Sequence, residues 1–113
     1  MPYIELKTDK KIANELEAEL IRAFGSAIEI FPGKNEKYLM VSIEDECKMA
    51  FAGEIGSCAL VSVDLLGSAT AQVYEKMTKH VCELVSKALG IEEDRVYVKY
   101  SEYKTWGWNG INF

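Results

Sequence analysis

The sequence predicts an α/β (α+β) fold in which two βαβ repeats form a four-stranded mixed sheet with two helices on one face. Two observations predict it. Two stretches show helical periodicity and four show the pattern of strands. These stretches follow one another as strand, helix, strand in each half of the chain. With 113 residues, of which 49% are hydrophobic, the chain fits one domain spanning residues 1–113.

The predicted helices are amphipathic and end at glycines. Residues Lys10–Phe24 carry apolar side chains at spacings of three and four, and Gly25 follows as a helix stop. Residues Ser68–Leu89 repeat the pattern, with the first residue or Thr70 as N-cap and Gly90 as stop. Both apolar stripes are expected to face the core.

The four predicted strands differ in their patterns. Tyr3–Lys7 and Arg95–Tyr100 alternate between apolar and polar residues. Tyr38–Ile43 and Cys58–Leu66 are nearly continuous apolar runs, which are typical of strands covered on both faces. A helix that connects two strands of one sheet makes those strands parallel, and such crossovers are nearly always right-handed. Both helices should therefore lie on the same face of the sheet. The aromatic tail Trp106–Phe113 is expected to form a docked hairpin or an edge strand.

The sheet face opposite the helices needs a cover, because its strands are also expected to be apolar. A homo-oligomer that packs sheet against sheet would supply that cover.

Charge and composition argue against several classes of partner. The chain has 13 Lys and Arg against 18 Asp and Glu, a net charge of -5, and no basic cluster, so no nucleic-acid binding is expected. No apolar run approaches the roughly 20 residues of a membrane helix. The start, Met1–Glu5, lacks the features of a secretory signal. The expected location is the cytoplasm, and release would need a route without a signal peptide.

The three cysteines, Cys47, Cys58 and Cys82, are far apart and form no C-x-x-C motif. They are expected to be reduced and partly buried, and no metal site or cofactor is predicted.

Pro2 is the most informative candidate for chemistry. Removal of Met1, which occurs when the second residue is small, would leave a secondary amine at the start of the first strand. An α-amino group titrates near about 7.7–8, and burial or a nearby cation lowers its pKa. A neutral proline nitrogen can take a proton from carbon. By itself Met-Pro is a weak signal, since in most proteins it is only an exposed start.

Other candidates also have plainer interpretations. Lys34, in a Gly-Lys turn, would by itself be a solvated charge, and Tyr97 by itself would be a residue of sheet packing. His80, beside the apolar stripe of the second helix, is expected at the solvent edge.

Several stretches in order resemble the macrophage migration inhibitory factor family of the tautomerase superfamily over almost the whole chain. They are Met1-Pro2, Pro32-Gly33-Lys34 with Tyr38, Met49-Ala50-Phe51-Ala52-Gly53, Cys58-Ala59-Leu60, Leu66-Gly67, Asp94-Arg95-Val96-Tyr97 and Gly107-Trp108-Asn109-Gly110 before Asn112-Phe113.

The resemblance implies a homotrimer that catalyses keto–enol tautomerisation of phenylpyruvate-like α-keto acids without metal or cofactor. It assigns the general base to Pro2, the carboxylate-binding cation to Lys34 and a backbone contact to Leu66. Tyr97 would come from a neighbouring subunit. The aromatic residues expected to hold the substrate ring are Tyr38, Trp108 and Phe113.

Lys99 departs from the family pattern, because the best-known mammalian member has asparagine there. Lys99 either joins Lys34 as a second cation near Pro2 or extends into solvent.

Two other functions stay open. The first is a cytokine-like protein-interaction module with a vestigial pocket, although nothing in the residues supports receptor binding. The second is hydration or dehalogenation of a small unsaturated acid, which usually needs more arginines than Arg22 and Arg95.

Overall fold

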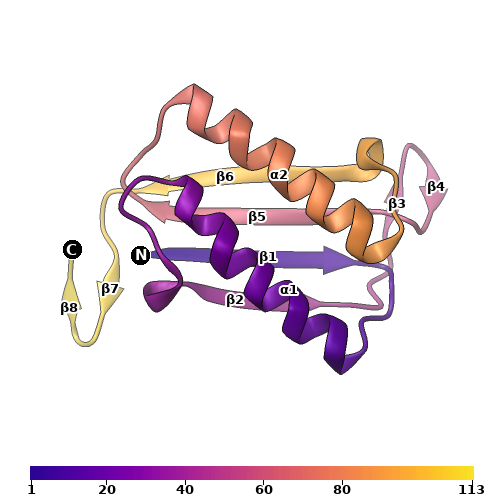
Figure 1. The fold of residues 1–113 in the computed structure, drawn as a ribbon, viewed down its shortest axis with the longest axis horizontal. Coiled ribbons are helices and arrows are strands. Elements are labelled where there is room, and N and C mark those ends of the chain that lie inside the picture. Colours follow the sequence, from indigo (N-terminus) through magenta and orange to yellow (C-terminus); the bar gives the residue numbers. More distant parts are fainter.

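Four strands pair into one mixed sheet in the order β2-β1-β5-β6, in a computed structural model that describes residues 1–113. The pairs β1–β2 and β5–β6 are parallel and the central pair β1–β5 is antiparallel, so two βαβ units meet at the middle of the sheet (Figure 1). The predicted sheet is confirmed. Its strands are β1 (Pro2–Thr8), β2 (Met40–Glu44), β5 (Ala59–Leu66) and β6 (Val96–Tyr103).

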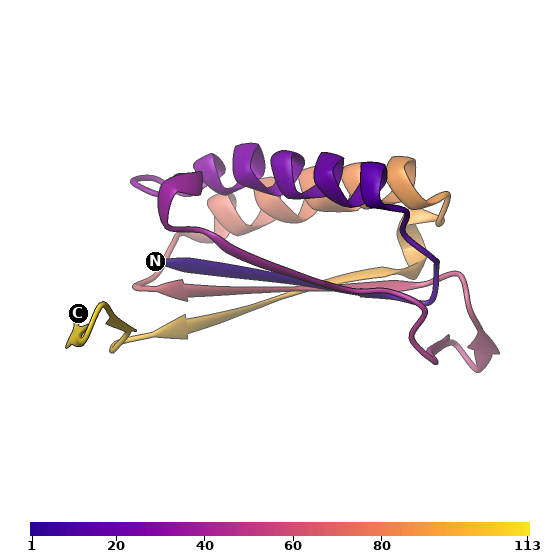
Figure 2. The same ribbon diagram turned by 90° about the horizontal axis from the view of Figure 1, so that it is seen from below.

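Both helices, α1 (Asn14–Ala27) and α2 (Ala71–Leu89), cover one face of the sheet, as Figure 2 shows. Their apolar stripes meet alternate residues of the central strands. No helix is long and apolar enough to span a membrane. The fully buried side chains of this layer include Ile4, Leu6, Leu20, Phe24, Val61, Val63, Leu65, Met77, Val81 and Val85.

The ends of α1 differ from the prediction. The helix begins at Asn14 because the Ile12 N–H donates to Asp45 Oδ2 at 2.8 Å, which holds the preceding segment against the end of β2. The interpretation of Gly25 as a helix stop is wrong, since the helix continues to Ala27. A Cβ at Gly25 would collide with the side chain of Glu36, so this glycine permits a close approach.

The ends of α2 agree with the prediction. Thr70 Oγ1 accepts a hydrogen bond from the Val73 N–H at 3.3 Å and is the N-cap. Gly90 adopts the left-handed conformation (φ 66°) and its N–H donates to the Ser86 carbonyl at 2.9 Å.

The uncovered face of the sheet is more polar than expected. Alternate residues of β5 are buried, and between them Ser62 and Asp64 point to the other face. On β1 the Tyr3 hydroxyl lies 2.6 Å from Ser42 Oγ of β2. In the single chain β5 is therefore covered on one face only, and its open face mixes polar and apolar groups.

Two short hairpins extend beyond opposite ends of the sheet (Figure 1). One pairs β3 (Ala50–Phe51) with β4 (Glu54–Ile55). The other pairs β7 (Gly107–Trp108) with β8 (Ile111–Asn112), so the predicted C-terminal hairpin is present. Its turn residues Asn109 and Gly110 have positive φ (52° and 79°), as a type I′ turn requires.

Candidate active site

Four segments meet at the end of the sheet where β1 begins. Pro2 pairs with Leu65 near the end of the antiparallel strand β5. The Pro32–Lys34 turn, the 3₁₀ turn Glu36–Tyr38 before β2 and the C-terminal hairpin lie at the same end (Figure 1). Because β1 and β5 are antiparallel, the start of the chain faces the β5–α2 connection.

The peptide groups of Leu66 connect the chain start to Lys34. The Leu66 N–H donates to the Met1 carbonyl at 3.1 Å. Lys34 Nζ donates to the Leu66 carbonyl at 2.9 Å. The lysine is placed by a turn in which its own N–H donates to Phe31 O at 3.1 Å and Gly33 has φ 78°. The ammonium of Lys34 is thereby fixed beside the first residues of β1.

The environment at this point favours a neutral amine. The pKa of the Met1 amino group is lowered from its ordinary value, first by burial and then by the positive charge of Lys34 and its hydrogen bond. Burial and a neighbouring cation both disfavour an ammonium ion. An amine at the start of β1 therefore carries more free base at neutral pH than an amine in water.

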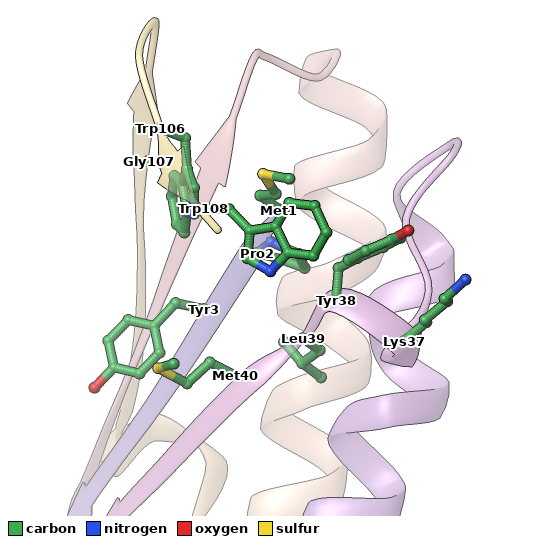
Figure 3. A pocket seen from close by; sticks show the side chains of 10 residues that line it. All are labelled: Met1, Pro2, Tyr3, Lys37, Tyr38, Leu39, Met40, Trp106, Gly107 and Trp108. Atoms are coloured by element: carbon green, nitrogen blue, oxygen red, sulfur yellow. The ribbon is translucent and has the colours of Figure 1, made fainter. Parts of the chain in front are cut away.

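A pocket of about 620 Å³ opens at this amine (Figure 3). The rings of Tyr38 and Trp108 meet across it edge to face, with centroids 5.8 Å apart. Such a volume is within the usual range for small-molecule sites, roughly 300–1,000 Å³. The lining residues are Met1, Pro2, Tyr3, Lys37, Tyr38, Leu39, Met40, Trp106, Gly107 and Trp108.

The remaining predicted residues of this end lie around the pocket. Lys34 lines an adjoining cavity of about 180 Å³ beside the start of α2. Leu66 and Phe113 line another cavity of about 540 Å³ on the β6 side. Phe113 also packs on Trp108, with ring centroids 6.2 Å apart. Within one chain, the predicted base, cation and aromatic residues thus gather at one end of the sheet.

Tyr97 and Lys99 lie elsewhere in this chain. Pro2 pairs with Leu65, which in turn pairs with Glu102, and Tyr97 lies five positions before Glu102, near the start of β6. At about 3.3 Å per residue this separates it from Pro2 by roughly 16 Å along the sheet. The ring of Tyr97 packs on that of Phe51, with centroids 5.1 Å apart, and Tyr97 is 63% exposed. A role for both residues at the pocket requires a neighbouring subunit and stays a prediction.

Three residues that line the pocket, Tyr3, Met40 and Lys37, were not singled out in the sequence. They are placed there by the register of β1 and β2 and by the 3₁₀ turn. Tyr3 and Met40 are register partners in the parallel β1–β2 pair and therefore point to the same face. Alternation along the two strands was visible in the sequence, but their register was not. Lys37 lines the pocket because Tyr38 ends a 3₁₀ turn instead of beginning the strand.

No group of three or more His, Cys, Asp or Glu side chains is placed to hold a metal ion. The three cysteines are unpaired, and burial raises the pKa of the Cys58 and Cys82 thiols.

Comparisons with known proteins identify the class. The family model for macrophage migration inhibitory factor matches residues 1–113. The factor of Rattus norvegicus is 34% identical over 83 residues, 72% of each chain. The factor of Xenopus laevis is 26% identical over 118 residues, covering 100% of this chain and 99% of its own.

Solved structures agree over the whole fold. The crystal structure of Leishmania major MIF2 has a TM-score of 0.93 at 29% identity, over 100% of this chain and 97% of that one. The homologue from Prochlorococcus marinus has a TM-score of 0.80 at 28% identity, over 98% of each chain. The fold is that of the tautomerase superfamily. Within that class, the chain belongs to the macrophage migration inhibitory factor family.

Proposed function

We propose that this protein is a cofactor-independent isomerase that interconverts the keto and enol forms of phenylpyruvate-like α-keto acids. The general base would be the amine of Pro2 after removal of Met1. One observation carries the proposal: the amine of Met1, directly before Pro2, has a lowered pKa beside Lys34 and at an aromatic pocket, and the Pro2 amine would meet the same surroundings once Met1 is removed.

Loss of Met1 would also expose a binding group. The Leu66 N–H donates to the Met1 carbonyl in the full chain, so it would lose its acceptor. The freed N–H and the Lys34 ammonium flank the same point and are both donors, which suits a carboxylate. Departure of the Met1 side chain, which lines the pocket, would make room for the substrate.

The chemistry needs one proton transfer at carbon and one at oxygen. Lys34 and the Leu66 N–H hold the carboxylate, and Tyr38 and Trp108 hold the aryl ring. The Pro2 nitrogen takes a proton from C3, the C3–H electron pair forms the C2–C3 double bond, and the carbonyl oxygen takes a proton from water. The positive charge of Lys34 stabilises the developing enolate. A positioned base typically contributes about 10²–10⁴-fold to the rate.

The proposal includes assembly as a homotrimer. Support comes from the open sheet face, from the 63% exposure of Tyr97 and from a structural neighbour, a fused 4-OT solved as a symmetric trimer, with a TM-score of 0.83 at 21% identity. Light scattering is expected to give three times the 12.7 kDa mass of one chain. A monomer at micromolar concentration would contradict the trimer and remove the subunit that supplies Tyr97.

The decisive experiment follows the enol-to-keto conversion of phenylpyruvate by the wild-type and Pro2→Gly proteins. Glycine is also small enough for Met1 removal, and mass spectrometry verifies that both chains start at residue 2. The variant is expected to lose about 10²-fold or more in kcat/KM. Equal rates would exclude Pro2 as the base. An inert wild-type protein would favour the interaction-module alternative.

A further inference from the structure

Lys37 places a positive charge on the outer rim of the pocket. Asn35 Oδ1 accepts a hydrogen bond from the Lys37 N–H at 2.9 Å, which holds the 3₁₀ turn that presents Lys37 and Tyr38 together. Lys37 Nζ lies 5.4 Å from the centroid of the Tyr38 ring, within the range of a cation–π contact. In Figure 3 the lysine runs beside Tyr38, on the side away from Met1 and Pro2.

The charge of Lys37 has no acidic partner in the chain. The ion pairs of the structure involve Lys7 and Arg95. The acidic neighbour of Lys37 in the sequence, Glu36, packs its side chain over Gly25. None of the residues that line the pocket is acidic. Although the protein carries a net charge of -5, this pocket is positive at its outer rim and, through Lys34, near the amine.

We propose that Lys37 selects α-keto acids whose side chain ends in a second anionic group, such as an aryl ring with a para carboxylate. This inference rests on the proposed function, which puts the reacting carboxylate at Lys34 and the ring against Tyr38 and Trp108. Lys37 lines the same pocket and lies beyond Tyr38, on the side away from Pro2, where it can meet a group that extends past the ring. The pocket, at about 620 Å³, has room for a substrate longer than phenylpyruvate.

The size of the preference follows from the exposure of the lysine. Lys37 is solvent-exposed, so its attraction for an anion is screened by water and salt. Exposed ion pairs of this kind change an equilibrium by about two- to fivefold. The preference is therefore modest and should fall as the salt concentration rises, which a purely structural role of Lys37 would not produce.

The test compares kcat/KM for 4-carboxyphenylpyruvate and phenylpyruvate at low and high salt. Variants are Lys37→Gln and Lys37→Glu, with Lys79→Gln, an exposed lysine of α2, as control. Relative to wild type, the ratio of the two values is expected to fall about two- to fivefold in Lys37→Gln and further in Lys37→Glu. It should be unchanged in Lys79→Gln, and high salt should reduce the differences. A Lys37→Glu ratio equal to that of wild type would overturn the proposal.

If the proposed function itself is wrong, the experiment gives a different result, because the wild-type protein would then convert neither compound. In that case, binding of the same two compounds is measured through the fluorescence of Trp106 and Trp108, the only tryptophans, both of which line the pocket. Tighter binding of the dianion by wild type than by Lys37→Glu supports the selection by charge. Equal affinities contradict it.

Discussion

Leu66 contributes to the site through its peptide group, whose N–H and C=O face the Met1 carbonyl and Lys34. A backbone contact of this kind does not depend on the leucine side chain and would tolerate its replacement. In the proposed function the main-chain nitrogen of Pro2 is the base and Lys34 is its neighbouring cation, and the effect of one on the other can be tested by pH.

Replacing Lys34 by methionine is expected to shift the pH–rate profile toward higher pH. The base must be neutral, so the rate rises with pH through the pKa of the amine. Lys34 contributes, after burial, to the lowered pKa of the Met1 amine at this end of β1, so its removal should move the acid limb to higher pH. KM for phenylpyruvate should also increase, because the carboxylate loses its cation. Lys34→Arg, which keeps the charge, is the control. If the acid limb of Lys34→Met lies at the same pH as that of the wild-type protein, Lys34 does not lower the pKa of the base.

The site residues were predictable to the extent that their chemistry shows in the sequence. Pro2 stands out as a second-position proline, whereas the roles of Lys34 and Tyr38 were expected only from the family resemblance. Lys37 and Met40 do not stand out, because their places depend on a 3₁₀ turn and on the β1–β2 register. A shift of two residues keeps every side chain on its face, so the hydrophobic pattern fixes the face of a residue without naming its exact partner on the next strand.

At the scale of the elements, one side chain, Arg95, contacts the hairpin β3–β4 and the residues that follow it. Arg95 donates from Nε to the Ser57 carbonyl and from Nη2 to the Gly56 carbonyl, both at 2.7 Å. Its guanidinium also lies 5.3 Å from the ring of Phe51. Positive φ angles recur in this segment, at Ala52 and Ser57 among others, so its backbone is held in conformations of higher energy. The sequence indicated a strand start at Arg95 and could not show that its side chain reaches back to residues 51–57.

Arg95→Lys is expected to destabilise the protein by about 2 kcal/mol, because lysine cannot reproduce the planar fork that binds several carbonyls. Hydrogen exchange of the amides of residues 50–57 should increase more than that of the sheet. Chemical denaturation and exchange mass spectrometry measure both effects. The matched control is Arg22→Lys on the exposed side of α1. Equal stability and equal exchange in the two variants would show that the carbonyl contacts contribute little.

At the scale of the whole molecule, the open face of the sheet is the feature that an assembly of subunits would explain. Sequence periodicity predicted the sheet and both helices, because a single chain must bury those stripes. The interpretation of Cys58–Leu66 as a nearly continuous apolar run was wrong, because Ser62 and Asp64 alternate with the buried residues of β5 and make the other face partly polar. A face with polar groups in its middle and exposed Tyr97 and Met40 toward its edges suits an assembly in which the edges make the contacts.

In such an assembly Lys99 can be tested as a second cation near Pro2. Lys99 follows Tyr97 on the same face of β6, opposite Ser62 of β5, and is exposed in the single chain. If a neighbouring subunit brings it to the pocket, Lys99→Asn removes a positive charge that disfavours the ammonium form of Pro2. The acid limb of the pH–rate profile should then move to higher pH, and KM for anionic substrates should increase. Lys87→Asn on α2 is the control. Should the limb and KM both stay at their wild-type values in a protein that is a trimer by light scattering, Lys99 extends into solvent and Lys34 is the cation that governs the amine.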